Sequence, residues 1–422
     1  MKGETADLFD QVFPTQAPQH AVVPRREFKP WHKPRKQFIR AHQWNREALK
    51  LITRYLDLTI RPAGTEDDPE DFGYASSADR PVEMGIEHPL RCLVLPGEDL
   101  LDVRSLWHGI KDLGCWIKYL GFNQGQGSDN LDTRVHIATN EVNALDKIHR
   151  QSTVIRDRFQ SIASRQSQAY FLMKDAGPFD IVNLDLCDSL FPVRSVGGQA
   201  PVGYYNALHQ LANYQNAHRT KPWLLFITTQ VEPELMDPEG MRKLLQPVGK
   251  NCSISRVFAA RLAEIVAENA IPSDDGAVDL ANLSHEHVFR LFGVGLGKWL
   301  LRLVFSGEPK WTVLMLPSYS YGIKENVARM ASLAFLFRRK SAPMRDETGL
   351  SQLELPVTKP IDEQDCALKL LKAVEGIKDV DGILAGNAGL HREMTEASAT
   401  LLELAGYDRK AYCEWVKKPE TA

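Results

Sequence analysis

Five apolar segments alternate with helix-like segments between residues 89 and 230, and this alternation limits the fold more than any other feature of the sequence. Parallel strands need a crossover connection of a dozen or more residues, so regular alternation favours a parallel sheet. Several segments are apolar on both faces, which is typical of strands that helices cover on both sides. The predicted strands are 90–95, 115–123, 152–159, 179–186 and 221–230.

The alternation stops after residue 230. Residues 240–270 and 285–307 are predicted to be largely helical, and two strand-like segments follow at 310–323 and 330–339. This late pair predicts a sheet that ends in an antiparallel hairpin. The run Gly293-Val294-Gly295-Leu296-Gly297 is similar to part of a dinucleotide-binding turn, but helix-like sequence flanks it on both sides. Because such a turn must follow a strand and open a helix, we predict close helix packing through small residues instead.

Composition and charge define the class of protein. The 422 residues carry a net charge of −3, so the overall charge gives no reason to expect nucleic acid or an anionic membrane as a partner. No apolar stretch approaches the roughly 20 residues that span a bilayer, and the N-terminus lacks the features of a signal peptide. Six cysteines are scattered without CxxC spacing, as in reduced cytosolic proteins. We therefore expect a soluble cytoplasmic protein that does not contact a membrane.

Composition also divides the chain into five segments. We predict a flexible arm over 1–24, a basic strap and helix over 25–61, an acidic linker over 62–88, an α/β domain over 89–340 and a helical C-terminal domain over 341–422. The predicted fold class is therefore α/β with helical additions at both ends. The C-terminal helices are a candidate surface for a protein partner. The histidines are dispersed and lack the spacing of a helical metal site, so we expect no metal.

The strap is the clearest polar feature of the sequence, because aromatic residues lie between its many cations. Cations can contact phosphates, while aromatic rings and guanidinium planes can stack on bases, so the strap is the predicted nucleic-acid surface. In the alternative interpretation, its aromatic rings pack on the sheet and its cations pair with the acidic stretch 66–71. The cations of the predicted surface are Arg25, Arg26, Lys29, Lys33, Arg35, Lys36 and Arg40.

The order of five alternating strands and a late pair resembles the class I S-adenosylmethionine-dependent methyltransferases, over roughly residues 89–338. The best local match is FDIVNLDLCDSL, residues 179–190, a strand that ends in an acidic residue. Its L-D-L-C-D-S run is similar to the D-L-D-P-x-G-S pattern of tRNA guanine dimethyltransferases, and also resembles three-Cys-motif partner proteins of bacterial genomes. Leu186 stands where the pattern has proline, and Asp188 where it has glycine.

The resemblance implies a Rossmann-like sheet with S-adenosylmethionine at the carboxyl ends of its strands. The first turn has one glycine, and Asn123 stands where the family has an acidic residue for the ribose hydroxyls. The donor residues that the resemblance implies are Pro96, Gly97, Glu98, Asn123 and Asp157. The catalytic candidates are Asp185 and Asp188, which could instead cap a turn and a helix. Tyr319 and Tyr321 follow a predicted strand and are candidates for the substrate rim or for a β-turn.

Two functions are consistent with these features. One is a methyltransferase-like enzyme that acts on nucleic acid, which the acidic Asp157 and Asp185 favour. The other is an inactive methyltransferase fold that serves as a scaffold or recognition subunit for nucleic acid or a protein partner. The short turn at Pro96 and the neutral Asn123 favour the scaffold. The likeness to three-Cys-motif partners adds a role in a bacterial defence or RNA-modification system.

Overall fold

The computed structural model describes residues 27–56, 85–124, 129–192, 203–307, 309–324, 327–340 and 362–418. The predicted arm and residues 62–84 of the predicted linker lie outside these ranges. None of the described helices is long and apolar enough to cross a membrane.

A nine-stranded sheet forms the centre of the fold, in the order β3-β2-β1-β4-β5-β8-β7-β9, and β6 also pairs with β8. Strands β1 to β5 pair parallel with one another, and β8 is antiparallel to β5, β6 and β7. The structure thus confirms the α/β class, with a mostly parallel Rossmann-like sheet that ends in antiparallel strands. The strands are β1 (Leu90–Val94), β2 (Ile117–Phe122), β3 (Thr153–Ile155), β4 (Ile181–Ser189), β5 (Trp223–Gln230), β6 (Trp311–Met315), β7 (Tyr319–Lys324), β8 (Val327–Arg339) and β9 (Lys378–Asp379).

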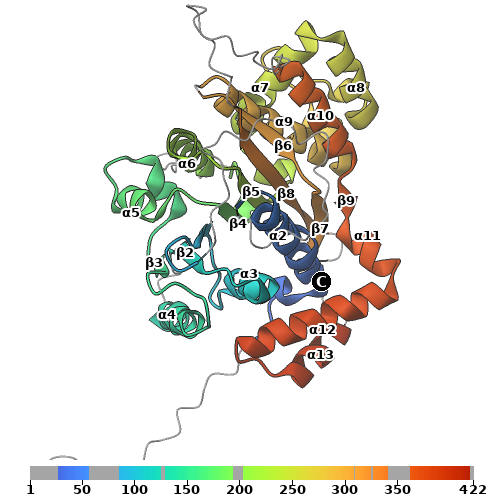
Figure 1. The fold of residues 1–422 in the computed structure, drawn as a ribbon. Coiled ribbons are helices and arrows are strands. Elements are labelled where there is room, and N and C mark those ends of the chain that lie inside the picture. The colour runs from blue at the N-terminus through green and yellow to red at the C-terminus, as the bar shows by residue number, and fades with distance from the viewer. Residues whose placement is uncertain are drawn as a thin grey trace, which may run out of the picture.

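Helices cover both faces of this sheet (Figure 1). Successive residues of a strand point to opposite faces, so Val182 and Leu184 of β4 lie in one hydrophobic core and Ile181 lies in the other. The first core contains residues of α6, α7, α9 and α10, and the second contains residues of α2, α3 and α12. The helices between β1 and β9 are α3 (Leu101–Ile110), α4 (Asp129–Asn143), α5 (Gln168–Ala176), α6 (Tyr204–His218), α7 (Pro238–Ile254), α8 (Arg256–Val266), α9 (His285–Phe305) and α10 (Glu363–Glu375).

The strap, defined from here on as residues 27–56, lies against the second face of the sheet. Its helical part runs through α1 (Pro34–Ile39), a π-helical segment (Arg40–Asn45), α2 (Arg46–Leu51) and a second π-helical segment (Ile52–Leu56). Phe38 and Trp44 are buried in the second core, which is the packing that the alternative interpretation of the strap predicts. Figure 1 shows this blue helix crossing in front of the sheet beside β4, β5 and β8.

The C-terminal helices share the cores of the α/β segment. Helix α10 packs on α9 in the first core, while α12 (Ala388–Leu404) packs on α1 and α3. The remaining elements of the tail are α11 (Val380–Ala385) and α13 (Arg409–Lys417). The Phe28 ring of the strap lies 5.6 Å from the Tyr407 and Tyr412 rings and 5.3 Å from the Trp415 ring. The two ends of the described chain therefore meet in one aromatic cluster, Phe28, Tyr407, Tyr412 and Trp415.

The structure corrects two of the predicted elements. The residue pattern of 139–150 predicts a helix that opens on Thr139 or Asn140, whereas α4 already begins at Asp129 and ends at Asn143. The Thr139 hydroxyl donates to the Val135 carbonyl oxygen (2.7 Å) within that helix instead of capping it. The single strand predicted at 310–323 is two strands, β6 and β7, which pair with successive parts of β8.

The glycine run in α9 packs helices together, as predicted. A Cβ built at Gly295 would lie 3.0 Å from Leu244 Cγ of α7, and one at Gly297 would lie 2.8 Å from Leu370 Cδ2 of α10. A larger residue at either position requires a shift of the leucine side chains that it contacts. The run is therefore a packing surface and lies within a helix.

Candidate functional site

A cavity of about 600 Å³ opens at the carboxyl ends of β1, β2 and β4. The strand order reverses there, because the chain leaves β1 toward β2 and β3 and then returns to β4 and β5 on the other side. Open α/β sheets bind their ligands at such a switch point, and the volume is in the range of small-molecule sites. The lining comes from the strap, the turn after β1, the segments after β2 and β3, the end of β4, and β7.

The turn after β1 forms one wall of this cavity. Asn123, which follows β2, donates from Nδ2 to the Pro96 carbonyl oxygen (2.8 Å) and so fixes the turn. A Cβ at Gly121 would lie 3.0 Å from Pro96 Cγ, so glycine there is what lets the turn approach β2. A Cβ at Gly97 would meet nothing within 4 Å. The Gly97 backbone therefore faces open space that a ligand can occupy.

The same turn ends in a strained residue. Leu100, which precedes α3, has φ of 49° and ψ of 36°, a left-handed conformation that costs a non-glycine residue about 1–2 kcal/mol. Its side chain is fully buried, so packing in the second core holds the conformation. Backbone strain of this kind is concentrated at functional sites.

The segment after β3 forms the opposite wall. The Asp157 carboxylate accepts hydrogen bonds from the Ser161 hydroxyl (2.7 Å) and from the Arg158 N–H (2.6 Å). These bonds hold the 3₁₀ turn Phe159–Ala163 in place. The Phe159 ring lies edge-on to the Phe122 ring, with 6.1 Å between centroids. This wall therefore offers both a carboxylate and an aromatic surface.

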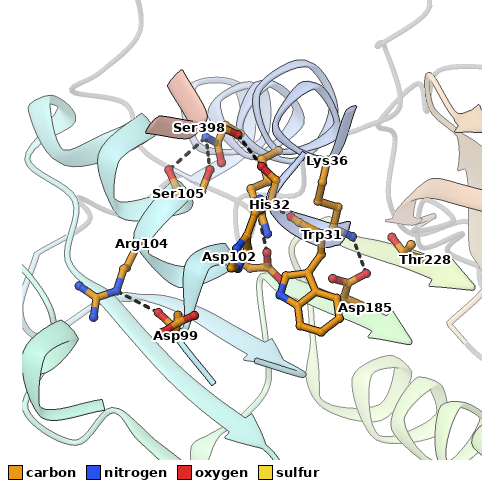
Figure 2. Close-up of polar contacts among 12 residues, drawn as sticks. Trp31, His32, Lys36, Asp99, Asp102, Arg104, Ser105, Asp185, Thr228 and Ser398 are labelled. Atoms are coloured by element: carbon orange, nitrogen blue, oxygen red, sulfur yellow. Dashed lines mark hydrogen bonds and ion pairs between the residues drawn. The ribbon is translucent and has the colours of Figure 1, made fainter. Parts of the chain in front are cut away.

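Two buried cations and their two partly buried acids lie where the strap crosses β4 and the start of α3. Lys36 Nζ lies 2.6 Å from Asp185 Oδ1, and Arg40 Nε lies 3.0 Å from Asp102 Oδ1. Figure 2 shows Lys36 reaching from the strap helix to Asp185, with Asp102 and Trp31 beside this pair. Each buried cation is matched by one acid, and such pairing is the condition under which charges are tolerated away from water.

The electrostatics of these groups follow from burial and from their partners. Burial lowers the pKa of Lys36, but the interactions with Asp185, Tyr321 and Asp102 together outweigh this effect and hold the pKa above its usual value. Burial, with a contribution from Asp102, raises the pKa of Asp185 against the opposing charges of Lys36 and Arg40. Burial raises the pKa of Tyr321 to about 12, so its hydroxyl remains protonated at neutral pH and can donate a hydrogen bond.

The cavity brings together most of the predicted donor and catalytic residues. Pro96, Gly97, Glu98, Asn123 and Asp157 all line it, together with Asp185 and Tyr321. Asp188 is exposed and does not line it. Tyr319 is also outside the lining, because its ring packs edge-on against Phe38 (5.3 Å) in the second core.

The predicted nucleic-acid cations are mostly occupied within the protein. Arg35 Nε lies 3.3 Å from Asp381 Oδ1, and Lys33 Nζ lies 4.2 Å above the Trp415 ring. Lys36 and Arg40 are paired as described above, and Lys29 forms an exposed pair with Glu27 (3.3 Å). Arg25 and Arg26 lie outside the described residues, as does the acidic stretch 66–71 that was expected to pair with the strap.

Two residues of the site, Asp102 and Asp99, were not singled out from the sequence, whereas Trp31 is one of the aromatic residues between the strap cations. Asp102 belongs to α3, and Trp31 lines the cavity although its side chain is 45% exposed. Asp99 accepts a hydrogen bond at Oδ2 from the Tyr407 hydroxyl (2.6 Å), which ties the tail to the turn after β1. Asp102 could have been noticed in the sequence, because it is an acidic residue within a segment whose apolar pattern predicts a packed helix. The contacts of Asp99 and Trp31 depend on the tertiary structure, and no local pattern indicates them.

His32 connects the strap to the tail close to this site. Its carbonyl oxygen accepts hydrogen bonds from the Tyr412 hydroxyl (2.7 Å) and the Ser398 hydroxyl (3.3 Å). Burial, with smaller contributions from the Arg40 and Lys29 charges, lowers the pKa of the His32 imidazole to about 3. The ring is therefore neutral at neutral pH. Among the described residues, no group of three or more His, Cys, Asp or Glu side chains is arranged to hold a metal ion.

Comparison with known proteins places the chain in a family. No curated protein matches its sequence. One family model, described as PP_RS20740-like, matches residues 25–417. The match extends from the strap to α13, so strap, sheet and tail all lie within the matched region. The chain belongs to the PP_RS20740-like family.

Proposed function

We propose that the protein is a methyltransferase-like enzyme that binds S-adenosylmethionine in the cavity at the switch point. The observation that carries the proposal is that five residues from three separate turns, Pro96, Gly97, Glu98, Asn123 and Asp157, line one cavity together with Asp185. When bound, the donor would supply an electrophilic methyl group.

The chemistry of the cavity suits a nucleoside joined to an amino acid. The Phe122 and Phe159 rings offer an apolar surface for a planar base. The open space at Gly97 lets a ligand approach the backbone of the first turn. Asp157 is a carboxylate acceptor on the facing wall, and Arg134 and Glu98, paired at 3.1 Å, provide both charges for a zwitterionic end.

Asp185 is the residue that we place at the acceptor. Its side chain is 22% exposed and lines the cavity at the end of β4. As a carboxylate it can accept a hydrogen bond from an acceptor amine or hydroxyl and orient the nucleophile, or take up its proton.

Calorimetric titration with S-adenosylmethionine and S-adenosylhomocysteine tests donor binding. We expect micromolar affinity that falls at least tenfold in Asp157→Asn, because one carboxylate acceptor in the wall is lost. Asp112→Asn is the matched control, since Asp112 is exposed on the 3₁₀ segment Lys111–Leu113 and does not line the cavity. A well-folded wild-type protein that gives no heat with either ligand would overturn the proposal.

We further propose that the acceptor is nucleic acid and that it reaches the cavity beside Trp31. This ring is exposed yet lines the cavity, and the Lys29 and Arg158 side chains line it as well. A stacked base contributes about 1–3 kcal/mol, so Trp31→Ala should weaken binding of single-stranded RNA or DNA by about 5- to 150-fold. Phe171→Ala, which removes another exposed ring outside the cavity, is the control in a fluorescence anisotropy titration. Equal affinities for both variants would remove the cavity from nucleic-acid recognition.

A second candidate function is a scaffold or recognition subunit without catalysis. The observation in its favour is that Lys36 already binds the Asp185 carboxylate at 2.6 Å, in the position that we assign to the acceptor. In this function, the cavity serves recognition. A protein that does not bind S-adenosylmethionine but still binds nucleic acid or a protein partner would support the scaffold.

A further inference from the structure

Lys36 is the most deeply buried of the strap cations that line the cavity. Only 2% of its surface is exposed, and its Nζ is surrounded by three different partners. Asp185 Oδ1 lies at 2.6 Å, the Tyr321 hydroxyl oxygen at 3.3 Å, and the Trp44 ring centroid at 4.7 Å. A carboxylate, a phenol oxygen and an aromatic face together form a complete site for one ammonium group.

The partner groups come from elements that are far apart in the sequence. Lys36 and Trp44 belong to the strap, and Tyr321 lies in β7. Asp185 lies in β4, where the register with β5 begins to shift. Asp185 points to this face because it alternates with Leu184 and Leu186, which lie in the opposite core. The contact is therefore set by the register of β4 and by the position of the strap on the sheet.

The charges around Asp185 explain why a lysine is needed there. Arg40 and Lys36 approach from the strap, Asp102 approaches from α3, and the Tyr321 hydroxyl from β7. Arg40 is itself engaged by Asp102, so the Lys36 ammonium is the cation that contacts Asp185 directly. Without it, the pKa of a partly buried carboxyl beside a second carboxylate would rise further, so the proton that turns this acceptor into a donor would bind at higher pH.

We propose that Lys36 is a positioning residue, which holds the Asp185 carboxylate charged and fixed in orientation at the cavity. The role of that carboxylate toward an acceptor rests on the proposed function, whereas the coupling between Lys36 and Asp185 does not. Lys36 also joins strap and sheet mechanically, so the test must separate a change in protonation from a loss of packing.

Isotope-edited infrared spectroscopy of the full-length protein, labelled with ¹³C-aspartate, reports the protonated carboxyl directly. In Lys36→Met we expect the carboxyl band of Asp185 to titrate at higher pH than in the wild type, and Asp185→Asn identifies that band by removing it. Lys36→Arg keeps the charge and should restore most of the wild-type titration. An unchanged titration in folded Lys36→Met would overturn the proposal.

The chain offers a matched control for the loss of a buried lysine. Lys298 is 3% exposed, and its Nζ lies 2.6 Å from Glu363 Oε1, between α9 and α10 and outside the cavity lining. Lys298→Met should disturb packing to a similar degree and leave the Asp185 band unmoved. If both methionine variants move the band equally, the effect is one of general destabilisation and the proposal fails.

The reciprocal measurement keeps the proposal testable where Lys36→Met does not fold. Linkage requires that Asp185 affects Lys36 as strongly as Lys36 affects Asp185, so the ¹³Cε resonance of Lys36 should titrate at lower pH in Asp185→Asn than in the wild type. An unchanged lysine titration would refute the coupling. Calorimetry with S-adenosylhomocysteine on the same proteins separates the methyltransferase proposal from the positioning role of Lys36. If the protein does not bind this ligand but the Asp185 carboxyl band still moves in Lys36→Met, only the methyltransferase function is rejected.

Discussion

Single alanine substitutions in α9 measure how closely this helix packs on α10. A Cβ built at Gly297 lies 2.8 Å from Leu370 Cδ2 and 3.2 Å from Leu370 Cγ, which is closer than carbon atoms normally approach. A Cβ built at Gly293 lies 3.5 Å from Val374 Cγ2, an ordinary contact. Gly297→Ala therefore adds a methyl group where there is no room, and Gly293→Ala adds one where there is.

The two substitutions should change the free energy of unfolding by different amounts, because both gain helix propensity but only Gly297→Ala is overpacked. Alanine favours a helix over glycine by about 0.8–1.0 kcal/mol, and this gain applies at both positions. Overpacking costs typically about 1–3 kcal/mol and applies at Gly297 alone. We expect Gly293→Ala to raise the free energy of unfolding by up to about 1 kcal/mol. Gly297→Ala should fall below it by about 1–3 kcal/mol.

Urea denaturation of both full-length variants, followed by far-UV circular dichroism, gives this difference. The comparison is valid where the dependence on urea concentration has the same slope in both proteins. A thermal scan at one fixed rate provides an independent ranking. If Gly297→Ala is as stable as Gly293→Ala, the α9–α10 contact is not tight and the packing account of the glycine run is refuted.

Three further substitutions test the polar interior. The unfolded imidazole of His32 binds a proton between pH 6.5 and about 3 while the folded one does not, so the free energy of unfolding falls as pH falls through this window. His32→Asn should make the urea midpoint less dependent on pH across pH 7, 5 and 4. An unchanged pH dependence would assign it to other groups. Tyr407→Phe removes the 2.6 Å hydrogen bond from the Tyr407 hydroxyl to the buried Asp99 carboxylate. This should lower the free energy of unfolding by about 1–3 kcal/mol in urea denaturation. Unchanged stability would show that solvent replaces the hydroxyl. Arg219→Met removes the guanidinium 2.9 Å from buried Asp180 and should lower stability by about 3–5 kcal/mol in urea denaturation. A loss below about 1 kcal/mol would show that this pair contributes little to stability.

Local sequence patterns were enough to predict the parallel part of the sheet. Strands β1, β2, β4 and β5 are apolar runs, and a strand that is covered on both faces carries its signal within a few residues. Strand β3 is much shorter than the predicted segment 152–159, because only Thr153–Ile155 pair with β2 and none of the three is buried. The predictions failed where a boundary depends on context. Thr139 has the chemistry of an N-cap, yet its hydroxyl serves inside α4 because Ala138 and Val142 are buried on either side of it.

The candidate site was predictable only in part, for a physical reason. The ends of parallel strands lie at one edge of the sheet, so the turn at Gly97, Asn123, Asp157 and Asp185 could be expected to meet once the strand order was known. The position of the strap could not be predicted, because its many cations are equally typical of a solvent-exposed surface. Their partners Asp185 and Asp102 lie 149 and 62 residues further along the chain, and no local pattern encodes pairings at that separation.

The aromatic cluster that joins the strap to the tail has a consequence for how the chain is made. Tyr412 and His32, which share a hydrogen bond, are separated by 380 residues, so at about 5–20 residues per second the ribosome takes roughly 20 to 80 s to deliver the second partner after the first. The N-terminal end of the strap therefore lacks its contacts with the tail while the whole sheet is synthesised. The strap is translated before the sheet, yet its N-terminal end is secured only after the sheet is complete. A nascent chain stalled before α13 would carry the whole sheet while Phe28 still lacks the Tyr412 and Trp415 rings.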